Sequence, residues 1–180
     1  MDKSILREYV ESIVTAVVLA LIIITFIAQS FLVQGNSMEP GLHNGQRLLV
    51  EKLSYRVRPP QRGEIVVFRY PLDPRRKFIK RIIGIPGDEI FIKDRRVYVN
   101  GLPLEEDYIN GPTYGAYGPA VVPPDSYFVL GDNRNNSDDS RFPDVGFVPR
   151  KNIVGRALFI YWPVWQARLI RQPAIFAELN

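Results

Sequence analysis

Two residues, Ser37 and Lys80, combine a reactive side chain with a setting that could activate it. Ser37 lies in the polar turn formed by residues 34–41, where two glycines and a proline prevent a regular element from hiding its hydroxyl. Lys80 lies in an apolar run and could accept the proton of such a hydroxyl. A serine in a turn is more often only a turn residue, and a lysine in a strand is more often an edge residue. The pair is therefore a hypothesis that needs support from elsewhere in the chain.

The strand expected around Lys80 would bury its amine. Alternation along residues 78–85 places Phe78 and Ile82 on the same face as Lys80. Lysine ordinarily titrates with a pKa of about 10.4, and burial among apolar groups can lower that pKa by several units. A neutral lysine could then take the proton of a serine hydroxyl near neutral pH. The residues alone leave open whether Ser37 and Lys80 act together.

The composition removes most competing mechanisms. The absence of cysteine excludes a thiolate nucleophile, a disulfide framework and a cysteine zinc site. The single histidine, His43, would have to serve any serine-histidine-aspartate triad, and a histidine-rich metal site is impossible. With 23 basic and 19 acidic residues the net charge is +4, and no nucleic-acid-binding motif accompanies it. We expect no cofactor, no metal and no nucleic-acid partner.

A third segment, residues 131–141, is too polar to be a core strand. If Asp132 were the first ligand of an EF-hand calcium loop, the third position would be Arg134 and the sixth Ser137 instead of glycine, which breaks the rule for such loops. Residues 135–137 also match a glycosylation acceptor, a pattern too short to carry weight. The residues alone leave the role of this segment open.

The N-terminal segment has the pattern of a bilayer helix, because residues 12–38 carry no charge. At about 1.5 Å per residue, a helix over residues 12–33 would extend roughly 33 Å, enough for a hydrocarbon core of about 30 Å. A cleaved secretory signal is the alternative, since residues 28–30 resemble a small-x-small cleavage site, but the apolar run is longer than a signal's apolar core. We predict a cytoplasmic N-terminus over residues 1–11, one transmembrane helix over residues 12–33 and an extracytoplasmic domain over residues 34–180.

The rest of the chain predicts a mainly β domain. Its 15 prolines and 13 glycines are scattered between short apolar runs, which is typical of turns that join strands. A hairpin followed by a turn at Asn100 and Gly101 is expected within this region. The expected strands are residues 47–52, 65–69, 78–85, 90–93, 96–100, 126–130 and 152–161.

Two further regions have less certain roles in the sequence. Residues 111–124 are rich in glycine, proline and tyrosine and are expected to form a surface loop. The aromatic side chains of Tyr161, Trp162 and Trp165 could either pack in the core or touch a membrane interface. Neither region indicates a chemical function by itself.

Four segments resemble, in order and spacing, the boxes of the bacterial type I signal peptidases. The resemblance also covers the apolar segment before them and continues to the strand at residues 155–157, leaving about the last fifteen residues uninformative. It implies a signal-peptidase-like β catalytic domain preceded by one transmembrane helix. The four segments are residues 36–40 (Asn-Ser-Met-Glu-Pro), 62–68 (Arg-Gly-Glu-Ile-Val-Val-Phe), 80–88 (Lys-Arg-Ile-Ile-Gly-Ile-Pro-Gly-Asp) and 131–141 (Gly-Asp-Asn-Arg-Asn-Asn-Ser-Asp-Asp-Ser-Arg).

The resemblance implies a role for particular residues. Ser37 would be the nucleophile and Lys80 the general base, and the hydroxyl of Ser137 would orient the lysine amine. The backbone N–H of Ser37 would bind the oxyanion; some family members add a hydroxyl two residues before the nucleophile, where this chain has Gly35. A supporting ion-pair group near the site would consist of Asp139, Arg141 and Arg81.

The implied function is the removal of N-terminal signal peptides from exported precursor proteins by a peptidase of the cell membrane. Its partners would be these precursors, membrane lipid and, by proximity, the protein-export translocon. Anchoring would help, because a signal peptide is held in the same bilayer. Two alternatives remain. One is a self-cleaving serine-lysine protein of the repressor type. The N-terminal span and the lack of a helix-turn-helix region argue against it. The other is an inactive single-pass binding or adaptor protein.

Overall fold

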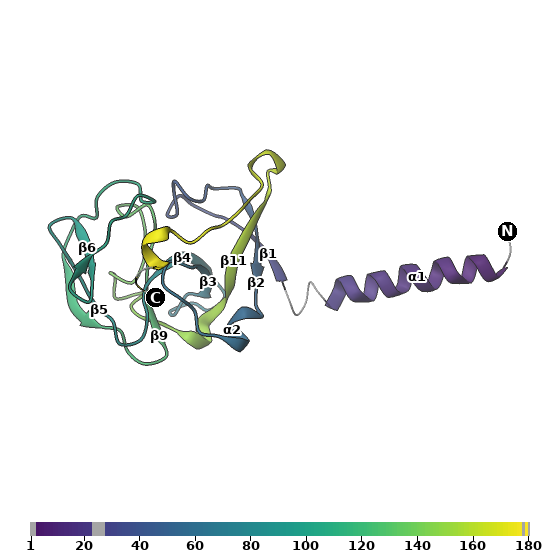
Figure 1. Cartoon of the computed structure of the whole chain (residues 1–180), viewed down its shortest axis with the longest axis horizontal. Coiled ribbons are helices and arrows are strands. Elements are labelled where there is room, and N and C mark those ends of the chain that lie inside the picture. The colour runs from purple at the N-terminus through teal and green to yellow at the C-terminus, as the bar shows by residue number, and fades with distance from the viewer. Residues whose placement is uncertain (1–2, 23–27, 178, 180) are drawn as a thin grey trace.

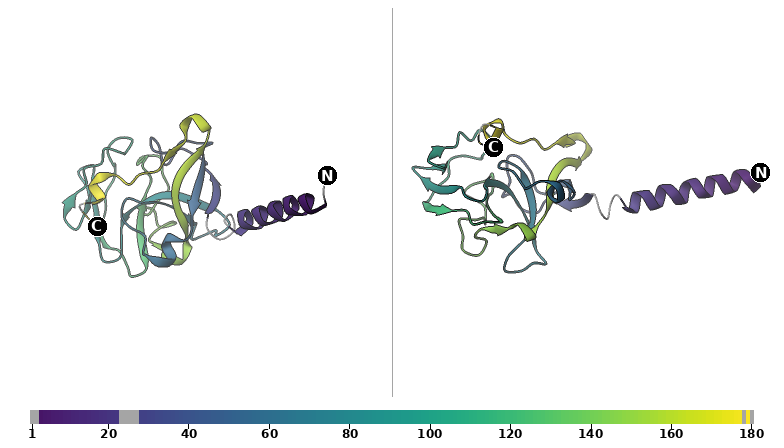
Figure 2. Two further views of the ribbon diagram at one scale, coloured as in Figure 1. Left: turned by 45° about the vertical axis from the view of Figure 1, so that its right-hand side comes forward. Right: turned by 60° about the horizontal axis from the view of Figure 1, so that its bottom comes forward.

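One long helix and two β-sheets dominate the computed structural model, which describes residues 3–22, 28–177 and 179. Helix α1 (Lys3–Ile22) projects away from the β domain (Figures 1 and 2). It contains neither glycine nor proline, and Arg7 pairs with Glu11 one turn later at 2.7 Å, which favours a continuous helix. Among the described residues, no helix is both long and apolar enough to cross a membrane.

The helix expected over residues 12–33 ends earlier than predicted. Residues 23–27 lie outside the described residues, and β1 (Ala28–Leu32) is a strand. It pairs antiparallel with β2 (Arg47–Glu51), so its backbone groups bond to a neighbouring strand instead of to the preceding helical turn. Phe31 packs against the core of the large sheet. The helical boundary at residue 33 is therefore wrong, because long-range pairing overrides the local apolar pattern.

The large sheet contains eight strands in the order β1-β2-β11-β3-β4-β9-β10, with β12 paired to β11. Its strands β3 and β9 are almost wholly buried, which explains why they appear in the sequence as continuous apolar runs. The strands expected for this region are all present. The bounds of the remaining strands are Ile65–Arg69 for β3, Lys77–Gly84 for β4, Ser126–Leu130 for β9, Val148–Pro149 for β10, Ile153–Trp162 for β11 and Arg168–Leu169 for β12.

The small sheet has four strands in the order β7-β6-β5-β8. The expected hairpin joins β5 (Glu89–Lys93) to β6 (Arg96–Val99) through Asp94 and Arg95, both with positive φ, the conformation of a two-residue hairpin turn. Asn100 and Gly101 also have positive φ and turn the chain into β7 (Leu102–Pro103). The predicted hairpin and turn are confirmed.

The surface loop expected over residues 111–124 is wrong in its second half. Residues Tyr117–Val121 form β8, which pairs antiparallel with β5. Gly118 has a φ of 74°, and a Cβ there would lie 2.3 Å from the carbonyl oxygen of Ile90. Only glycine allows this close approach of the two strands, so the residue that suggested a loop is the one that permits the pairing.

Three apolar clusters fill the described part of the domain, and one of them includes Val66, Ile82 and Val129 of β3, β4 and β9. A second lies between the small sheet and β4 and β9, and includes Ile83, Ile90, Phe128 and Phe176. The third lies beneath β1, β2 and β3, and includes the fully buried Leu48. The remaining short helices are α2 (Ser54–Val57) and the 3₁₀ helices η2 (Arg150–Asn152), η3 (Val164–Gln166) and η4 (Ala174–Ala177).

Candidate active site

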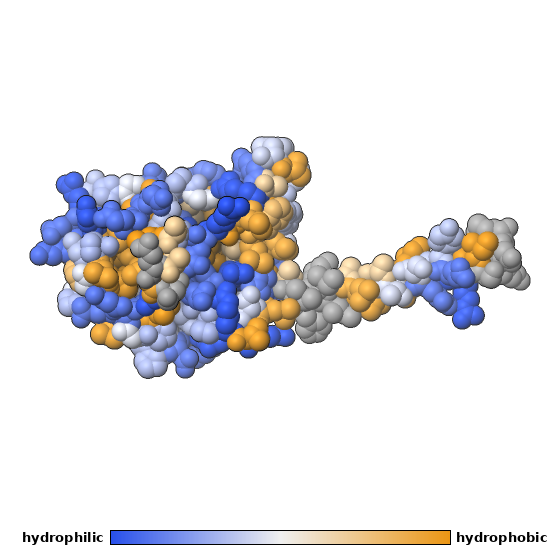
Figure 3. Space-filling view, in the orientation of Figure 1, coloured by the Kyte–Doolittle hydropathy of each residue, from blue (hydrophilic) through white to orange (hydrophobic). Residues whose placement is uncertain are grey.

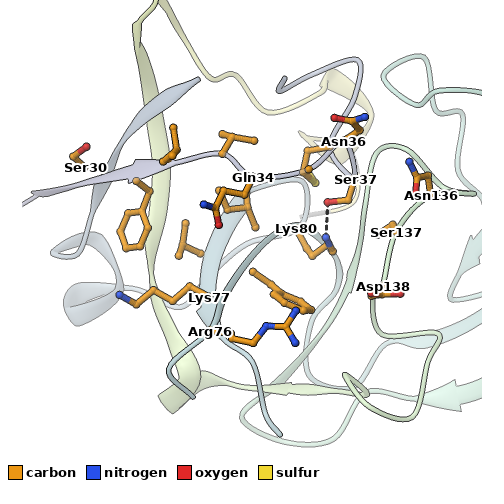
Figure 4. Close-up of a pocket in the computed structure, with 18 of the residues that line it drawn as sticks. Ser30, Gln34, Asn36, Ser37, Arg76, Lys77, Lys80, Asn136, Ser137 and Asp138 are labelled. Carbon is orange, nitrogen blue, oxygen red and sulfur yellow. Dashed lines mark hydrogen bonds between the residues drawn. The ribbon is translucent and has the colours of Figure 1, made fainter. Parts of the chain in front are cut away.

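The fold brings Ser37 and Lys80 together although 43 residues separate them in the chain. Ser37 follows β1 in a polar turn, and Lys80 lies in the middle of β4. The Nζ of Lys80 donates a hydrogen bond to Ser37 Oγ at 2.6 Å, drawn as a dashed line in Figure 4. The two side chains whose types predicted the chemistry are therefore in direct contact.

Strand β4 buries the amine of Lys80. Opposite Lys80 lies the fully buried Val66 of β3, and the ring of Phe78 lies 5.5 Å from Nζ, leaving only 4% of Lys80 exposed. Burial lowers the pKa of Lys80 from 10.5 to about 8. The carboxylates of Asp139, Asp138 and Asp132 oppose this shift, and the positive charge of Arg141 adds to it. The amine is thus held near the pKa that a base working at neutral to alkaline pH requires.

The turn that carries Ser37 is fixed by its backbone. Gly35 has a φ of 84° and donates its N–H to Asn44 Oδ1 at 2.9 Å. The carbonyl oxygen of Ser37 accepts a hydrogen bond from the N–H of Asn133 at 3.0 Å. The N–H of Ser37 itself has no hydrogen-bond acceptor within the part of the chain that the structure describes. This turn therefore presents a free backbone donor beside the hydroxyl.

Ser137 lines the same pocket, but its hydroxyl does not form the expected hydrogen bond to Lys80. Its Oγ is buried and has no hydrogen-bond partner among the described residues. The loop passes so close that a Cβ at Gly131 would lie 2.3 Å from Ser137 Oγ and 2.5 Å from the carbonyl oxygen of Ser37. Glycine at position 131 is thus required for this approach. The orienting role of Ser137 toward Lys80 stays a prediction.

The expected ion-pair group is divided into two separate pairs. Arg141 binds both carboxylate oxygens of Asp139 at 2.8 and 2.9 Å, and Asp139 also accepts the N–H of Gly131 at 3.1 Å. Arg81 instead binds Asp132 at 2.8 and 2.6 Å, and both side chains are almost fully buried. The single group that was predicted is therefore corrected, and Asp132 is a member that sequence reasoning missed.

A further buried pair supports the polar segment and was also missed. The guanidinium of Arg134, fully buried, forms two hydrogen bonds of 2.6 Å to Glu106 and one of 2.9 Å to Thr113. It also donates to the carbonyl oxygen of Gly131 at 3.1 Å. Arg134 lies in a motif that was noticed, but nothing in the sequence indicates Glu106 as its partner, because the contact joins two loops.

The contact between Ser37 and Lys80 lies at one end of a pocket of about 800 Å³. Figure 4 shows Ser37, Lys80 and Asn136 at one side of this pocket and Ser30 and Lys77 at the other. Its walls come from β1, the turn after it, β4 and the polar segment. His43 lies outside the pocket, exposed, 3.6 Å from Glu39.

The comparisons with known proteins identify the family of the chain. Residues 6–162 match the family model described as signal peptidase, peptidase S26. A Synechocystis protein named probable signal peptidase I-2 is 50% identical over 93% of this chain and 78% of its own length. Signal peptidase I of Bacillus licheniformis is 38% identical over 92% of this chain and 94% of its own.

A solved structure of a signal peptidase I from Enterococcus faecalis V583 is 34% identical, covers 55% of this chain and 97% of that chain, and has a TM-score of 0.49. Signal peptidase I of Leptolyngbya laminosa is 48% identical over 88% of this chain and 81% of its own length. Because the family model spans most of the chain and the curated relatives are matched along most of their length, the chain belongs to the signal peptidase family, peptidase S26.

Proposed function

We propose that this member of the family is a membrane-bound serine endopeptidase that removes N-terminal signal peptides from exported precursor proteins. The observation that carries the proposal is the 2.6 Å hydrogen bond between Lys80 Nζ and Ser37 Oγ at the end of an open pocket. Burial holds the amine at a pKa of about 8, so a useful fraction is neutral under mild conditions. Neither an inactive adaptor nor a binding protein would require a buried lysine beside a serine in this way.

In the proposed reaction, neutral Lys80 takes the proton of Ser37 Oγ as the oxygen attacks the scissile carbonyl carbon. The backbone N–H of Ser37, which has no acceptor among the described residues, donates to the oxyanion that forms. The protonated amine of Lys80 then gives its proton to the leaving nitrogen, and the peptide bond breaks. The same amine then takes a proton from water as the water oxygen attacks the acyl carbonyl, and it returns this proton to Ser37 Oγ as the acyl-enzyme bond breaks.

The pairs around this site are proposed to support it without touching the substrate's reacting atoms. Asp139 and Arg141 hold the loop that bears Ser137, because Asp139 also binds the N–H of Gly131. Arg81 follows Lys80 directly in β4 and is held by Asp132. Ser137 contributes a buried hydroxyl without a partner among the described residues, and its proposed role is to orient the amine of Lys80.

The direct test is cleavage of a precursor by the purified full chain in detergent. We expect one cut, after a signal peptide with alanine at the first and third positions before the cleavage site, as the resemblance to signal peptidases implies. Precursors with phenylalanine at both positions should be cut at least about tenfold more slowly, as the same resemblance implies. Sequencing the mature N-terminus locates the cut. Equal cutting of both precursors would contradict this specificity, and no cutting would contradict the function.

We propose that the apolar N-terminal segment anchors the chain in the cell membrane, with residues 1–11 cytoplasmic and the β domain outside. The apolar side chains of α1, such as Val14, Val17 and Leu21, are exposed. Apolar residues also gather on the side of the domain from which α1 leaves (Figure 3). The exposed apolar side chains of β1, β2, the end of β11 and η3 are Leu32, Leu49, Trp162, Val164 and Trp165. This position would place the pocket beside the bilayer that holds signal peptides and near the export translocon.

Anchoring predicts that the full chain stays with membranes during alkaline carbonate extraction. Replacing Leu19 and Leu21 by aspartate should release most of it, because both lie near the middle of the proposed span, where each charge costs about 3 kcal/mol. A matched variant with Glu8 and Glu11 changed to glutamine should remain bound, since both lie before the proposed span. Extraction of the unmodified chain by carbonate would contradict the anchor.

A further inference from the structure

Residues 168–177, here called the strap, connect the large sheet to the small one and lie beyond the part of the chain that the family model matches. Figures 1 and 2 show this yellow segment running from the tip of β11 to the side of the domain that holds β5 and β6. It begins as β12, antiparallel to β11, and Ile170 donates its N–H to the carbonyl oxygen of Leu158 at 2.8 Å. It ends in η4, which carries Phe176.

Phe176 docks the strap onto the backbone of Gly63. The ring of Phe176 is fully buried and belongs to the core behind the small sheet. A Cβ at Gly63 would lie 2.5 Å from Phe176 Cδ2 and 2.7 Å from Gln172 Cγ, so both strap residues rest directly on this glycine. The side-chain amide of Gln172 also donates to the carbonyl oxygen of Arg62. The position of the Gly63 peptide therefore depends on the strap.

Gly63 is in turn bonded to the ion pair behind the catalytic residues. Its carbonyl oxygen accepts a hydrogen bond from Arg81 Nη1 at 2.8 Å, and the same guanidinium holds Asp132. Tyr108 completes a second route, because its ring lies 4.5 Å from the Arg81 guanidinium carbon and 5.8 Å from the ring of Phe176. Both routes end at Arg81, the residue next to Lys80.

The ion pair is itself connected to the nucleophile. Asp132 is followed by Asn133, whose N–H donates to the carbonyl oxygen of Ser37 at 3.0 Å. Arg81 and Asp132 are each about 95% buried or more, so neither can compensate for a displaced partner by turning to water. A shift at Gly63 would thus reach Lys80 through β4 and Ser37 through Asn133.

From these contacts we propose that the strap is a positioning element for catalysis, with Phe176 as its positioning residue. The inference rests on the proposed function of Ser37 and Lys80. Phe176 lies outside the substrate pocket, and no strap residue lines that pocket. The strap should therefore govern the rate of the chemical step and leave the binding of the precursor almost unchanged.

The test measures kcat and KM for precursor cleavage by the full chain and by Phe176→Ala. We expect kcat to fall at least about tenfold and KM to change less than about twofold, because small displacements of reacting groups are costly. Phe176→Leu, which refills most of the space, should recover much of kcat. Leu169→Ala is the matched control, since this strap residue is 62% exposed, and it should behave as the parent.

Two additional measurements separate positioning from loss of folding. Hydrogen exchange at the Asn133 amide, which needs no substrate, should be faster in Phe176→Ala, while amides in β2, which packs in a separate apolar core, keep the parent's protection. Urea unfolding of the full-length Phe176→Ala protein should remain a single cooperative transition. The inference would be overturned if Phe176→Ala kept both the kcat of the parent and its exchange rate at Asn133. It would also be overturned if amides across the whole domain lost protection to the same extent. Failure of the parent chain to cut any precursor would instead contradict the proposed function.

Discussion

Replacing Ser37 by alanine, or Lys80 by methionine, is expected to lower precursor cleavage by at least about 10³-fold. The first change removes the attacking oxygen, and the second removes the only amine that contacts it among the described residues. The two losses should not add, because nucleophile and base act as one unit, and the double variant should be no slower than either single variant. Single-turnover cleavage in detergent measures the effect.

His43→Ala is the control for this comparison, because His43 is exposed and lies outside the pocket. It should cleave at the rate of the parent. Ser137→Ala should show a smaller loss than the Ser37 variant, since its hydroxyl makes no hydrogen bond to either catalytic residue in this structure. Near-normal turnover by the Ser37 or Lys80 variant would refute the assignment, and a large loss in His43→Ala would direct attention to a mechanism based on imidazole.

Lys80→Met should also make the fold more stable while it abolishes activity. Burial of an amine that is charged at pH 7 costs the folded state, as its lowered pKa records. Methionine removes this cost at the expense of one hydrogen bond, so we expect a gain of roughly 2 kcal/mol in the free energy of unfolding. Urea denaturation of both proteins at pH 7 measures the difference. A less stable Lys80→Met variant would indicate that the amine is adequately solvated or paired.

Cleavage should depend steeply on pH through the ionisation of Lys80. Because only the neutral amine can accept the proton of Ser37, and its pKa is about 8, the single-turnover rate should rise about tenfold per unit below pH 8 and level off above it. At pH 6 about 1% of the amine would be neutral. A lysine with an unshifted pKa would place the same bend near pH 10.4, so a parent profile that bends there would exclude Lys80 as a desolvated base.

Two substitutions should move this bend in opposite directions. Phe78→Ala should raise the pKa of Lys80, because water would replace the ring that lies 5.5 Å from Nζ and would solvate the charged amine. Asp138→Asn should lower the pKa, since the carboxylate of Asp138 favours the charged form of Lys80. Comparison of the two pH profiles with that of the parent tests burial and charge separately. Shifts in the same direction would contradict this account.

The same ionisation predicts how stability depends on pH. The pKa of Lys80 is lower in the folded state than its value of about 10.4 in the unfolded chain. Between about pH 8 and pH 10.4 the unfolded state therefore binds more protons, and stability should increase with pH across this window. Below about pH 8 the amine is charged in both states and the full cost of its burial remains. Lys80→Met should lack this increase, which unfolding measurements at two pH values would detect.

Local sequence patterns were sufficient for most of the architecture. The strands at Ile65–Arg69 and Ser126–Leu130 coincide with the predicted ranges, because continuous apolar runs bounded by turn residues leave few alternatives. The hairpin between β5 and β6 was also predicted, since its turn depends on adjacent residues only. The mainly β class followed from the same signals.

The residue types were enough to suggest Ser37 and Lys80 as candidates for chemistry. They could not predict that the two side chains touch each other. The absence of cysteine and the presence of one histidine limited the possible bases, and the resemblance to signal peptidases implied the pairing of Ser37 with Lys80. That Lys80 lies 2.6 Å from Ser37 depends on the turn after β1 folding back over β4. No periodic pattern encodes such an approach, because it joins segments that are far apart in the chain.

The errors share one physical cause, which is that long-range packing overrides local preference. Strand β1 was predicted as the end of a helix because its residues continue an apolar run, and pairing with β2 decided otherwise. Strand β8 was predicted as loop because Gly118 is a turn residue in most contexts, whereas here it permits contact with Ile90. Each outcome depends on the partner strand, which a local window does not contain.

The pairing of charged residues in the interior was likewise decided by the tertiary structure and not by local sequence. The sequence indicates that residues 131–141 are too polar for a core strand, but not that Arg81 pairs with Asp132 or that Arg134 pairs with Glu106. A buried guanidinium must find a carboxylate, and which carboxylate it finds is decided by the arrangement of loops. Composition and motif therefore determined the chemistry available to this chain, while the tertiary structure decided which groups meet, how deeply Lys80 is buried and hence at what pH it can act.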